Sequence, residues 1–231
     1  MSPDELQRVI ESLASPESTA PDGLPFGNRR EPLDELVYIL LTLMTRSLRA
    51  IEGCFSEVHQ LTGGRFDRFD QVAEDELVAA LRPVGLATRR SAQLRGISRA
   101  VRPQERWTEM LRSARDDDAL AALQALPGVG AKTAKCVLMY SLDRAVLPVD
   151  IHVLRVAKRL QLVEPDATWQ RTDRELEELV PDALKFDFHV RLVEHGRTIC
   201  RSRNPLCDDC PIAAGCPSRG TSGLPRRAYA L

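Results

Sequence analysis

Apolar side chains recur along the chain every three to four positions, the spacing of one face of an α-helix. The segment 34–45, which reads DELVYILLTLMT, is strongly apolar and predicts a buried helix. The same period predicts helices at 3–14, 47–61, 73–81, 88–102, 104–113, 118–125, 131–141, 151–160, 170–180 and 187–199. No segment shows a convincing strand pattern of alternating polar and apolar residues. We therefore predict an all-α fold in which short connections join the helices.

Glycine, proline and short polar residues mark the ends of these helices. Ser2 or Pro3 starts the first helix, and the loop SPESTAPDGLPFGNRR follows it. Gly63–Gly64 and Pro83–Gly85 are predicted breaks between helices. The three aspartates at 116–118 are expected to cap the helix that follows them.

The composition is that of an ordinary globular protein, because 43% of the 231 residues are apolar and 28% are charged. No apolar run approaches the ~20 residues that a membrane span needs. The first residues, MSPDELQRVIES, are acidic and lack the basic and apolar regions of a secretory signal. We expect a soluble, intracellular protein with no membrane partner. Six cysteines are too few for a disulfide framework, which a reducing compartment disfavours in any case.

Charge is distributed unevenly although the formal net charge is only −1. The stretch 82–102 carries six arginines and no acidic residue. Such a stretch suits a polyanion such as nucleic acid, and a solvated helix face is the alternative interpretation. On the strength of this uncompensated charge, we expect Arg89 and Arg90 to be among the residues that contact phosphates.

Four of the six cysteines, Cys200, Cys207, Cys210 and Cys216, lie within 17 residues in the pattern C-x6-C-x2-C-x5-C. Four thiolates so close in sequence can converge on one metal centre, and zinc is the generic interpretation. Zinc sites tend to pair two CxxC motifs, whereas the longer gaps here favour a [4Fe–4S] cluster held by four cysteines. Cys54 and Cys136 lie in apolar helical surroundings and are expected to be small buried hydrophobes.

A second motif, LPGVGAKTAKCVL at 126–138, joins two predicted helices through a turn with two glycines. Gly128 and Gly130 would let the backbone turn tightly and approach a ligand closely. Their amides, with those of the next helix start, could bind a phosphate oxygen without reading a base. A plain helix–helix turn without a ligand is the alternative.

Lys132 and Asp150 are the candidates for catalysis. Lys132 lies in the first turn of a helix, where the helix dipole and partial burial favour the neutral amine, a nucleophile towards carbonyl or sugar C1′ carbons. Asp150 precedes the predicted helix at 151–160 and has the position of an N-cap. An anionic carboxylate there could also stabilise positive charge that develops on a sugar.

Three motifs follow one another in the chain: LPGVGAKTA, an aspartate 18 residues after its lysine, and C-x6-C-x2-C-x5-C. In their order and spacing, these motifs resemble the endonuclease III branch of the helix-hairpin-helix DNA glycosylases. The resemblance extends over roughly residues 30–217. It implies two helical lobes: a six-helix barrel with the helix-hairpin-helix motif at 31–145, and an iron–sulfur cluster domain built from 1–30 and 146–231. It also implies that Lys132 forms a Schiff base, that Asp150 is the catalytic carboxylate, and that Arg201 and Arg203 approach phosphates from the cluster loop.

The function implied by the resemblance is base excision repair in the cytoplasm, in association with the nucleoid. A monomeric enzyme would bind double-stranded DNA with a damaged base or an abasic site, extrude the nucleotide and remove an oxidised pyrimidine. Its AP lyase activity would then nick the strand by β-elimination. The [4Fe–4S] cluster would have an architectural and DNA-docking role.

Two positions differ from the family pattern, which usually has a segment like LLSAQATD at this place. Met44 stands where the family has the glutamine that fills the gap left by the flipped base, and Ser47 stands in place of an aspartate. Leu86 resembles the leucine that opens the opposite strand, with a buried loop leucine as the alternative. Three other functions therefore remain open: a glycosylase of narrow or different specificity, a cluster-bearing protein that binds damaged DNA with weak catalysis, and a zinc-bound DNA-binding protein.

Overall fold

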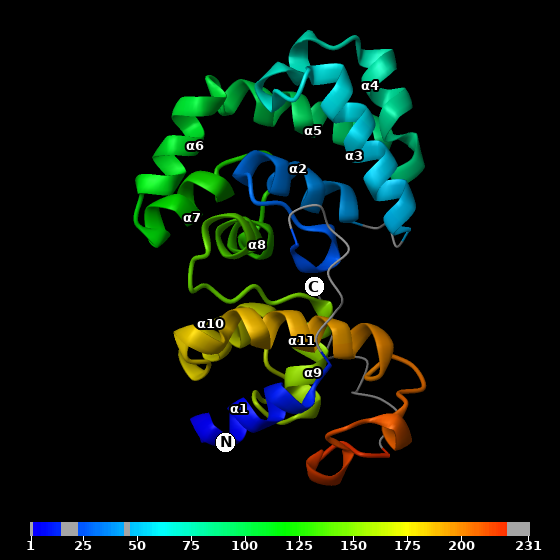
Figure 1. Ribbon diagram of the computed structural model, residues 1–231, viewed down its shortest axis with the longest axis vertical. Coiled ribbons are helices and arrows are strands. Elements are labelled where there is room, and N and C mark those ends of the chain that lie inside the picture. The colour runs from blue at the N-terminus through cyan, green and yellow to red at the C-terminus, as the bar shows by residue number, and fades with distance from the viewer. Residues whose placement is uncertain (1, 15–22, 44–46, 221–231) are drawn as a thin grey trace. The chain divides into compact units, whose positions relative to one another are not determined.

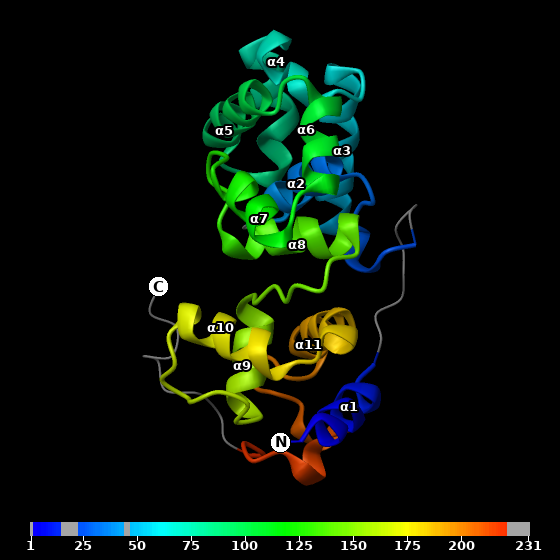
Figure 2. The ribbon, with the colours of Figure 1, turned by 90° about the vertical axis from the view of Figure 1, so that its left-hand side faces the viewer.

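A computed structural model describes residues 2–14, 23–43 and 47–220 of the chain (Figures 1 and 2). These residues form eleven α-helices, several 3-10 turns and no β-strand, which confirms the predicted all-α fold. None of the described helices is long and apolar enough to cross a membrane. The helices are α1 (Pro3–Ser12), α2 (Pro32–Thr42), α3 (Leu48–Thr62), α4 (Glu74–Leu81), α5 (Ala87–Ala100), α6 (Gln104–Ser113), α7 (Asp116–Gln124), α8 (Ala131–Leu142), α9 (Ile151–Arg159), α10 (Trp169–Leu179) and α11 (Lys185–Thr198).

Some helix boundaries follow from capping residues in the sequence. Ser2 caps α1 in a capping box, since its hydroxyl accepts from the Glu5 amide and the Glu5 carboxylate accepts from the Ser2 amide. Gly63 ends α3 in the left-handed conformation, with φ at 61°. The prediction for 116–118 was wrong in detail, because Arg115 is the N-cap of α7 and makes no side-chain capping bond. The three aspartates instead occupy the first turn, where their charge offsets the helix dipole.

The chain divides into two compact units, each described here by itself. Ser18–Arg144 form one unit, called the hairpin unit below because it contains the turn between α7 and α8. Met1–Glu17 and Ala145–Leu231 form the other, called the cysteine unit. The assignment of 31–145 to a six-helix barrel domain, and of 1–30 with 146–231 to an iron–sulfur cluster domain, stays a prediction.

Helix α2 forms the core of the hairpin unit. Almost every residue from Pro32 to Leu41 is buried, as expected for a helix that is apolar on all sides. It packs against α3 and α8, while α4 packs against α3 and α5. Figure 1 shows α3 to α7 in an arc around α2, with α8 on the other side of α2.

Helix α11 organises the cysteine unit by packing against α9 and α1. The contact with α1 buries Leu6, Ile10 and Leu13 of the N-terminal segment. Arg191 of α11 extends this contact by donating from Nη1 to the Leu13 carbonyl at 2.5 Å. Residues from the two ends of the sequence therefore share one core (Figure 2).

Candidate functional site

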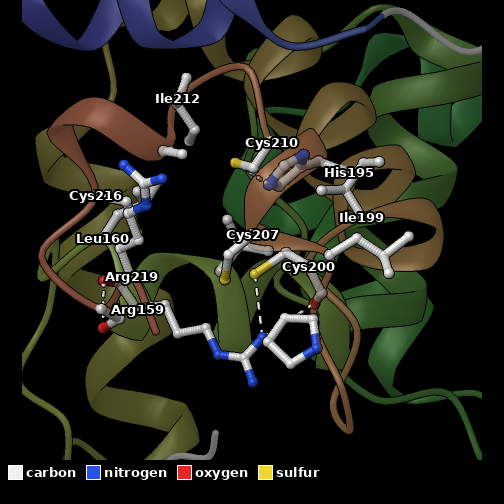
Figure 3. Close-up of a pocket in the computed structure, with 15 residues that line it drawn as sticks. Arg159, Leu160, His195, Ile199, Cys200, Cys207, Cys210, Ile212, Cys216 and Arg219 are labelled. Carbon is white, nitrogen blue, oxygen red and sulfur yellow. Dashed lines mark hydrogen bonds between the residues drawn. The ribbon is translucent and has the colours of Figure 1, made fainter. Parts of the chain in front are cut away.

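Four cysteines line one cavity of the cysteine unit, with about 460 Å³ of empty space counting the part open to solvent. Helix α9, the end of α11 and the loop 199–219 build its walls. Figure 3 shows the sulfur atoms of Cys200, Cys207 and Cys210 facing this space, with Cys216 beside them. The remaining cysteines, Cys54 and Cys136, are buried elsewhere, which confirms their predicted place in apolar packing.

Short turns place the four cysteines around the cavity. The Cys200 amide donates to the His195 carbonyl at 2.7 Å, which ties the first cysteine to the end of α11. The turn η5 (Cys207–Asp209) ends where the Cys210 amide donates to the Cys207 carbonyl, and η6 (Ala213–Gly215) leads into Cys216. The spacing of two and five residues between these cysteines therefore corresponds to two successive tight turns.

Positive charge and an uncharged imidazole contact the cysteine sulfurs. Arg159 donates from Nη1 to Cys200 Sγ at 3.1 Å and to the Arg201 carbonyl at 2.8 Å. His195 Nε2 lies 3.8 Å from Cys210 Sγ. Burial, together with the charge of Arg155, lowers the pKa of His195 to about 4, so this imidazole is neutral at neutral pH.

The donor set fits a metal cluster. Burial raises the pKa of the Cys210 thiol, and the other three cysteines raise it further. The four sulfurs line one cavity, and cysteine sulfur is a ligand that zinc and iron–sulfur clusters both take. In the part of the chain that the structure describes, no three His, Cys, Asp or Glu side chains are close enough to share one metal ion. The cysteines surround a space instead, as the four ligands of a cluster do.

The turn between α7 and α8 has the geometry that the two glycines predict. The Val129 amide donates to the Leu126 carbonyl at 3.2 Å, and Val129 is buried beneath the turn. Gly128 has φ at +68°, and a Cβ there would lie 2.4 Å from Gln93 Nε2. Gln93 Nε2 in turn donates to the Pro127 carbonyl at 2.9 Å. Gly128 and Gly130 are both exposed, and Gly130 is the N-cap of α8.

Lys132 and Asp150 each lie at the start of a helix, as predicted. Lys132 is the second residue of α8 and is partly exposed. Asp150 is the N-cap of α9, where its Oδ1 accepts from the His152 and Val153 amides, each at 2.8 Å. Lys132 belongs to the hairpin unit and Asp150 to the cysteine unit.

Leu86 is an exposed leucine, so the alternative of a buried loop residue was wrong. Its side chain is 55% exposed, and its φ of 52° places it in the left-handed region. It forms the N-cap of α5 and follows Gly85, whose φ is also positive at 76°. The segment Val84–Leu86, called the Leu86 loop below, therefore presents an apolar side chain at the surface.

The candidate phosphate contacts differ in exposure. Arg89 is exposed on α5, and Arg201 and Arg203 are exposed in the loop that the Leu206 amide closes by donating to the Ile199 carbonyl at 3.0 Å. The prediction for Arg90 was wrong, because this side chain is 5% exposed and its guanidinium donates to main-chain carbonyls. A phosphate outside the protein has no access to it.

Of the two departures from the family pattern, Met44 lies outside the described residues. Ser47 is the N-cap of α3, and its hydroxyl accepts from the Ala50 amide at 3.2 Å. Aspartate and serine are about equally good N-caps, so Ser47 retains the local helix start.

Sequence reasoning did not single out Arg159 and His195, which contact the cysteine sulfurs. Arg159 belongs to a run of buried basic residues on α9 that also includes Arg155 and Lys158. Buried basic residues are unusual unless they have a partner, and this was the available signal.

The all-helical fold, the glycine turn before Lys132 and the four-cysteine cavity together define a class, the helix-hairpin-helix proteins of DNA repair. The chain belongs to the HhH-GPD superfamily of base excision DNA repair proteins, a family of DNA glycosylases, whose family model matches residues 45–182.

Three relatives illustrate the similarity. Endonuclease III of Rickettsia felis is 29% identical over 196 residues, which cover 82% of this chain and 88% of the relative. Endonuclease III of Escherichia coli is 41% identical over 96 residues, which cover 42% of this chain and 45% of the relative. A protein of Methanocaldococcus jannaschii named as a DNA repair glycosylase is 30% identical over 152 residues, or 64% of this chain and 69% of that protein.

Solved structures share the fold. A non-covalent endonuclease III–DNA complex matches with a TM-score of 0.77 and 21% identity, over 94% of this chain and 96% of that one. A thermostable thymine-DNA glycosylase matches with a TM-score of 0.74 and 20% identity, over 93% and 94% of the two chains.

Proposed function

We propose that the protein is a bifunctional DNA glycosylase and AP lyase, which removes oxidised pyrimidines and nicks abasic DNA by β-elimination. The observation that carries the proposal is the position of Lys132, one residue into α8 after an exposed glycine turn, in a chain of a glycosylase family. The named endonuclease III relatives, 29% to 41% identical over the matched segments, support this choice of activity.

Lys132 is the proposed nucleophile. Its neutral amine attacks the sugar C1′, the glycosidic bond breaks, and the base leaves with the bonding electron pair and takes up a proton. The amine nitrogen loses a proton and the C1′–O4′ bond of the sugar breaks, with its oxygen taking up a proton, which gives a protonated imine between Lys132 and the opened sugar. Removal of a C2′ proton then expels the 3′ phosphate, and water hydrolyses the imine to restore the lysine.

Asp150 is the proposed catalytic carboxylate. One of its oxygens is fixed by two amide bonds of 2.8 Å at the start of α9. A carboxylate held in one orientation can stabilise positive charge on the sugar or accept a proton from the attacking amine without reorganising.

Cys200, Cys207, Cys210 and Cys216 would hold a [4Fe–4S] cluster. When bound, the cluster supplies a rigid centre that joins the loop 199–219 to α9 and α11. The cluster loop would then present Arg201 and Arg203 to DNA phosphates as a fixed surface.

Double-stranded DNA with a damaged base or an abasic site is the proposed partner of a monomeric protein that works on the nucleoid in the cytoplasm. The amides of Gly128 and Gly130 and the side chains of Arg89, Arg201 and Arg203 would contact phosphates. Leu86 and Met44 would enter the base stack as apolar wedges. The exposure of Leu86 supports its part in this arrangement.

A related glycosylase with a different damaged base is the second candidate. The fold match to a thymine-DNA glycosylase is nearly as close as the match to endonuclease III, with TM-scores of 0.74 and 0.77. The pocket that reads the base therefore decides the substrate, and the fold does not.

The test is reductive trapping on duplexes that contain one abasic site or one of a panel of single lesions. With borohydride, the wild-type protein should form a covalent adduct on abasic DNA, and Lys132→Gln should form none while binding the same DNA within a few-fold. Lys132→Arg, which keeps the charge but has no nucleophilic amine, should also form none. An adduct with either variant would show that Lys132 is not the nucleophile. Wild-type protein that binds, forms no adduct and releases no base from any lesion would be a damage-binding protein, whereas base release without an adduct would indicate a glycosylase without lyase activity.

A further inference from the structure

Arg90 is buried on α5 and contacts two segments that are far apart in sequence. Its Nε donates to the Gly85 carbonyl at 2.9 Å, and Nη2 lies 3.4 Å from the Val84 carbonyl. The same guanidinium donates to the carbonyls of Leu40 and Leu43 at the end of α2. One side chain therefore joins the Leu86 loop to the last described residues before Met44.

The Leu86 loop needs support from outside its own backbone. Gly85 and Leu86 have successive positive φ values, 76° and 52°. The left-handed conformation is unfavourable for a residue with a Cβ, so Leu86 would leave it if nothing held the loop. The side chain of Leu86 is also 55% exposed, so burial does little to hold it.

The end of α2 has a matching requirement. The last carbonyls of a helix have no amide partner within the helix and carry the negative end of its dipole. Arg90 supplies donors and positive charge to the Leu40 and Leu43 carbonyls. Because burying a charged group is costly, a guanidinium placed here indicates a role that an apolar residue could not fill.

The shape of the arginine side chain is essential to this contact. A guanidinium presents five N–H groups in a planar fork, so it can bond two segments at once. A lysine has one nitrogen at the same distance from the helix and would retain the charge without spanning both segments.

We propose that Arg90 is a positioning residue for strand opening, which holds Leu86 in the geometry needed to enter the DNA base stack. The proposal rests on the proposed glycosylase function. A wedge separates stacked bases only if its support does not yield, and Arg90 provides this support by fixing the loop to the core helix α2. Its contribution should therefore appear where the DNA must be opened and disappear where the DNA is already open.

Arg95 offers a matched control on the same helix. It also uses its guanidinium to bond main-chain carbonyls, those of Asp70 and Val72, with Nη2 donating to the Val72 carbonyl at 2.6 Å. These bonds tie α5 to the segment after α3 and not to the Leu86 loop. Arg95→Lys removes an equivalent guanidinium from α5 without affecting the bonds that hold the Leu86 loop.

The experiment measures single-turnover base removal by the wild type, Arg90→Lys, Leu86→Ala, the double variant and Arg95→Lys. The substrate is the lesion that the wild type removes fastest, placed either in a paired duplex or in an unpaired bubble. Arg90→Lys should slow removal about 10- to 100-fold in the duplex, since a small misplacement of a binding group can cost that much. The same variant should change the rate of base removal from the bubble by less than about three-fold, which is close to the error of such rates.

Coupling with Leu86 separates a positioning role from general destabilisation. If Arg90 acts through Leu86, the double variant should be no slower in the duplex than Leu86→Ala within about two-fold. Arg95→Lys should affect duplex and bubble equally. The proposal would be overturned if the rate losses of the two single variants multiplied in the double variant. It would also be overturned if Arg90→Lys slowed base removal equally on the duplex and on the bubble.

Amide exchange gives a readout that does not depend on activity. Arg90→Lys should increase exchange in residues 84–88 and 41–43, and Arg95→Lys should not. Unchanged exchange in Arg90→Lys would also overturn the proposal. If the wild type removes no base, the proposed function fails, while the exchange measurement still tests the contact itself.

A second variant covers the case in which Arg90→Lys does not fold. Gly85→Ala places a Cβ in open space at a positive φ, so it strains the Leu86 loop without a clash. The same loss on the duplex and retention on the bubble is expected, and an equal effect on both would contradict the proposed role of the loop.

Discussion

At the scale of single residues, Asp150 combines two functions in one carboxylate. Its Oδ1 accepts the two amide bonds that start α9, so the structure confirms that it is an N-cap. The proposed chemistry requires the negative charge of the carboxylate, whereas the capping bonds require only an oxygen acceptor. Substitutions can therefore separate the two.

Asp150→Asn should retain the cap and lose the chemistry. Because Asn is about as good an N-cap as Asp, the free energy of unfolding should change little, while base removal slows by roughly 10²–10⁴-fold. Asp150→Ala should slow base removal as much as Asp150→Asn does, and it should also lower the free energy of unfolding by about 1 kcal/mol. Denaturant melts and single-turnover rates provide the two measurements, and full activity of Asp150→Asn would exclude a catalytic role.

Exposure of individual arginines is the residue-scale property that the sequence did not predict. Arg89 and Arg90 are neighbours in one basic stretch, yet Arg89 is exposed and Arg90 is 5% exposed. The charge pattern does not distinguish them, although the helical period puts Arg90 on the face of the buried Leu94 and Ile97. The partners of Arg90 are carbonyls of distant segments, which no local pattern predicts. The positions of Lys132 and Asp150 at helix starts were predictable, since capping and turn residues are local signals.

At the scale of elements, the turn between α7 and α8 has two glycines under different constraints. Gly128 has a positive φ and no space for a Cβ beside Gln93. Gly130 is an N-cap with extended backbone, φ at −94°, and open space around it. The sequence presents both as equivalent turn glycines.

Gly128→Ala should therefore destabilise the protein far more than Gly130→Ala. The left-handed backbone alone costs about 1–2 kcal/mol, and Gln93 must also move, which weakens its bond to the Pro127 carbonyl. Gly130→Ala should cost under about 1 kcal/mol, the difference between two weak N-caps. Thermal melts of the two variants test this order, and equal losses would contradict it.

Helix existence was predicted more successfully than helix ends. The apolar period located every α-helix because burial of one face decides where a helix forms. The ends of the helices depend on capping and turn residues, which the apolar period does not include. Helix α2, for example, begins at Pro32 and not at residue 34, because proline suits the first helical position. The 3-10 turn η2 (Phe66–Gln71) was not predicted, because its buried Phe66, Asp67 and Phe69 follow no helical period.

At the scale of the whole molecule, local charge should dominate DNA affinity despite a net charge of −1. Arg89→Gln, Arg201→Gln and Arg203→Gln should each lower the slope of log K against log salt by about one unit. Arg95→Gln should leave the slope unchanged, because its guanidinium bonds carbonyls within the protein. Binding titrations across a range of salt concentrations provide the test. An unchanged slope in all three variants would show that these arginines do not contact DNA phosphates.

The cysteine unit should depend on its metal. The loop 199–219 contains only two short 3-10 turns among the described elements, and the cysteines between them line a common cavity. Cys207→Ser should therefore lower iron content and melting temperature together, whereas Cys54→Ser should keep the iron. About four iron atoms per chain and a brown absorbance near roughly 400 nm are expected for the wild type. Stoichiometric zinc without iron would establish the alternative.

The contact between α1 and α11 determines the order in which the protein can be completed during synthesis. Helix α1 leaves the ribosome before its partner α11, which follows only after the whole of the hairpin unit. At about 5–20 residues per second, Leu6 and Ile10 stay uncovered on the nascent chain for on the order of ten seconds or more. The hairpin unit is continuous in sequence and can fold within that interval. The four cysteines at 200–216 follow α11 in the sequence, so the proposed cluster can be loaded only after the partner of α1 has been made.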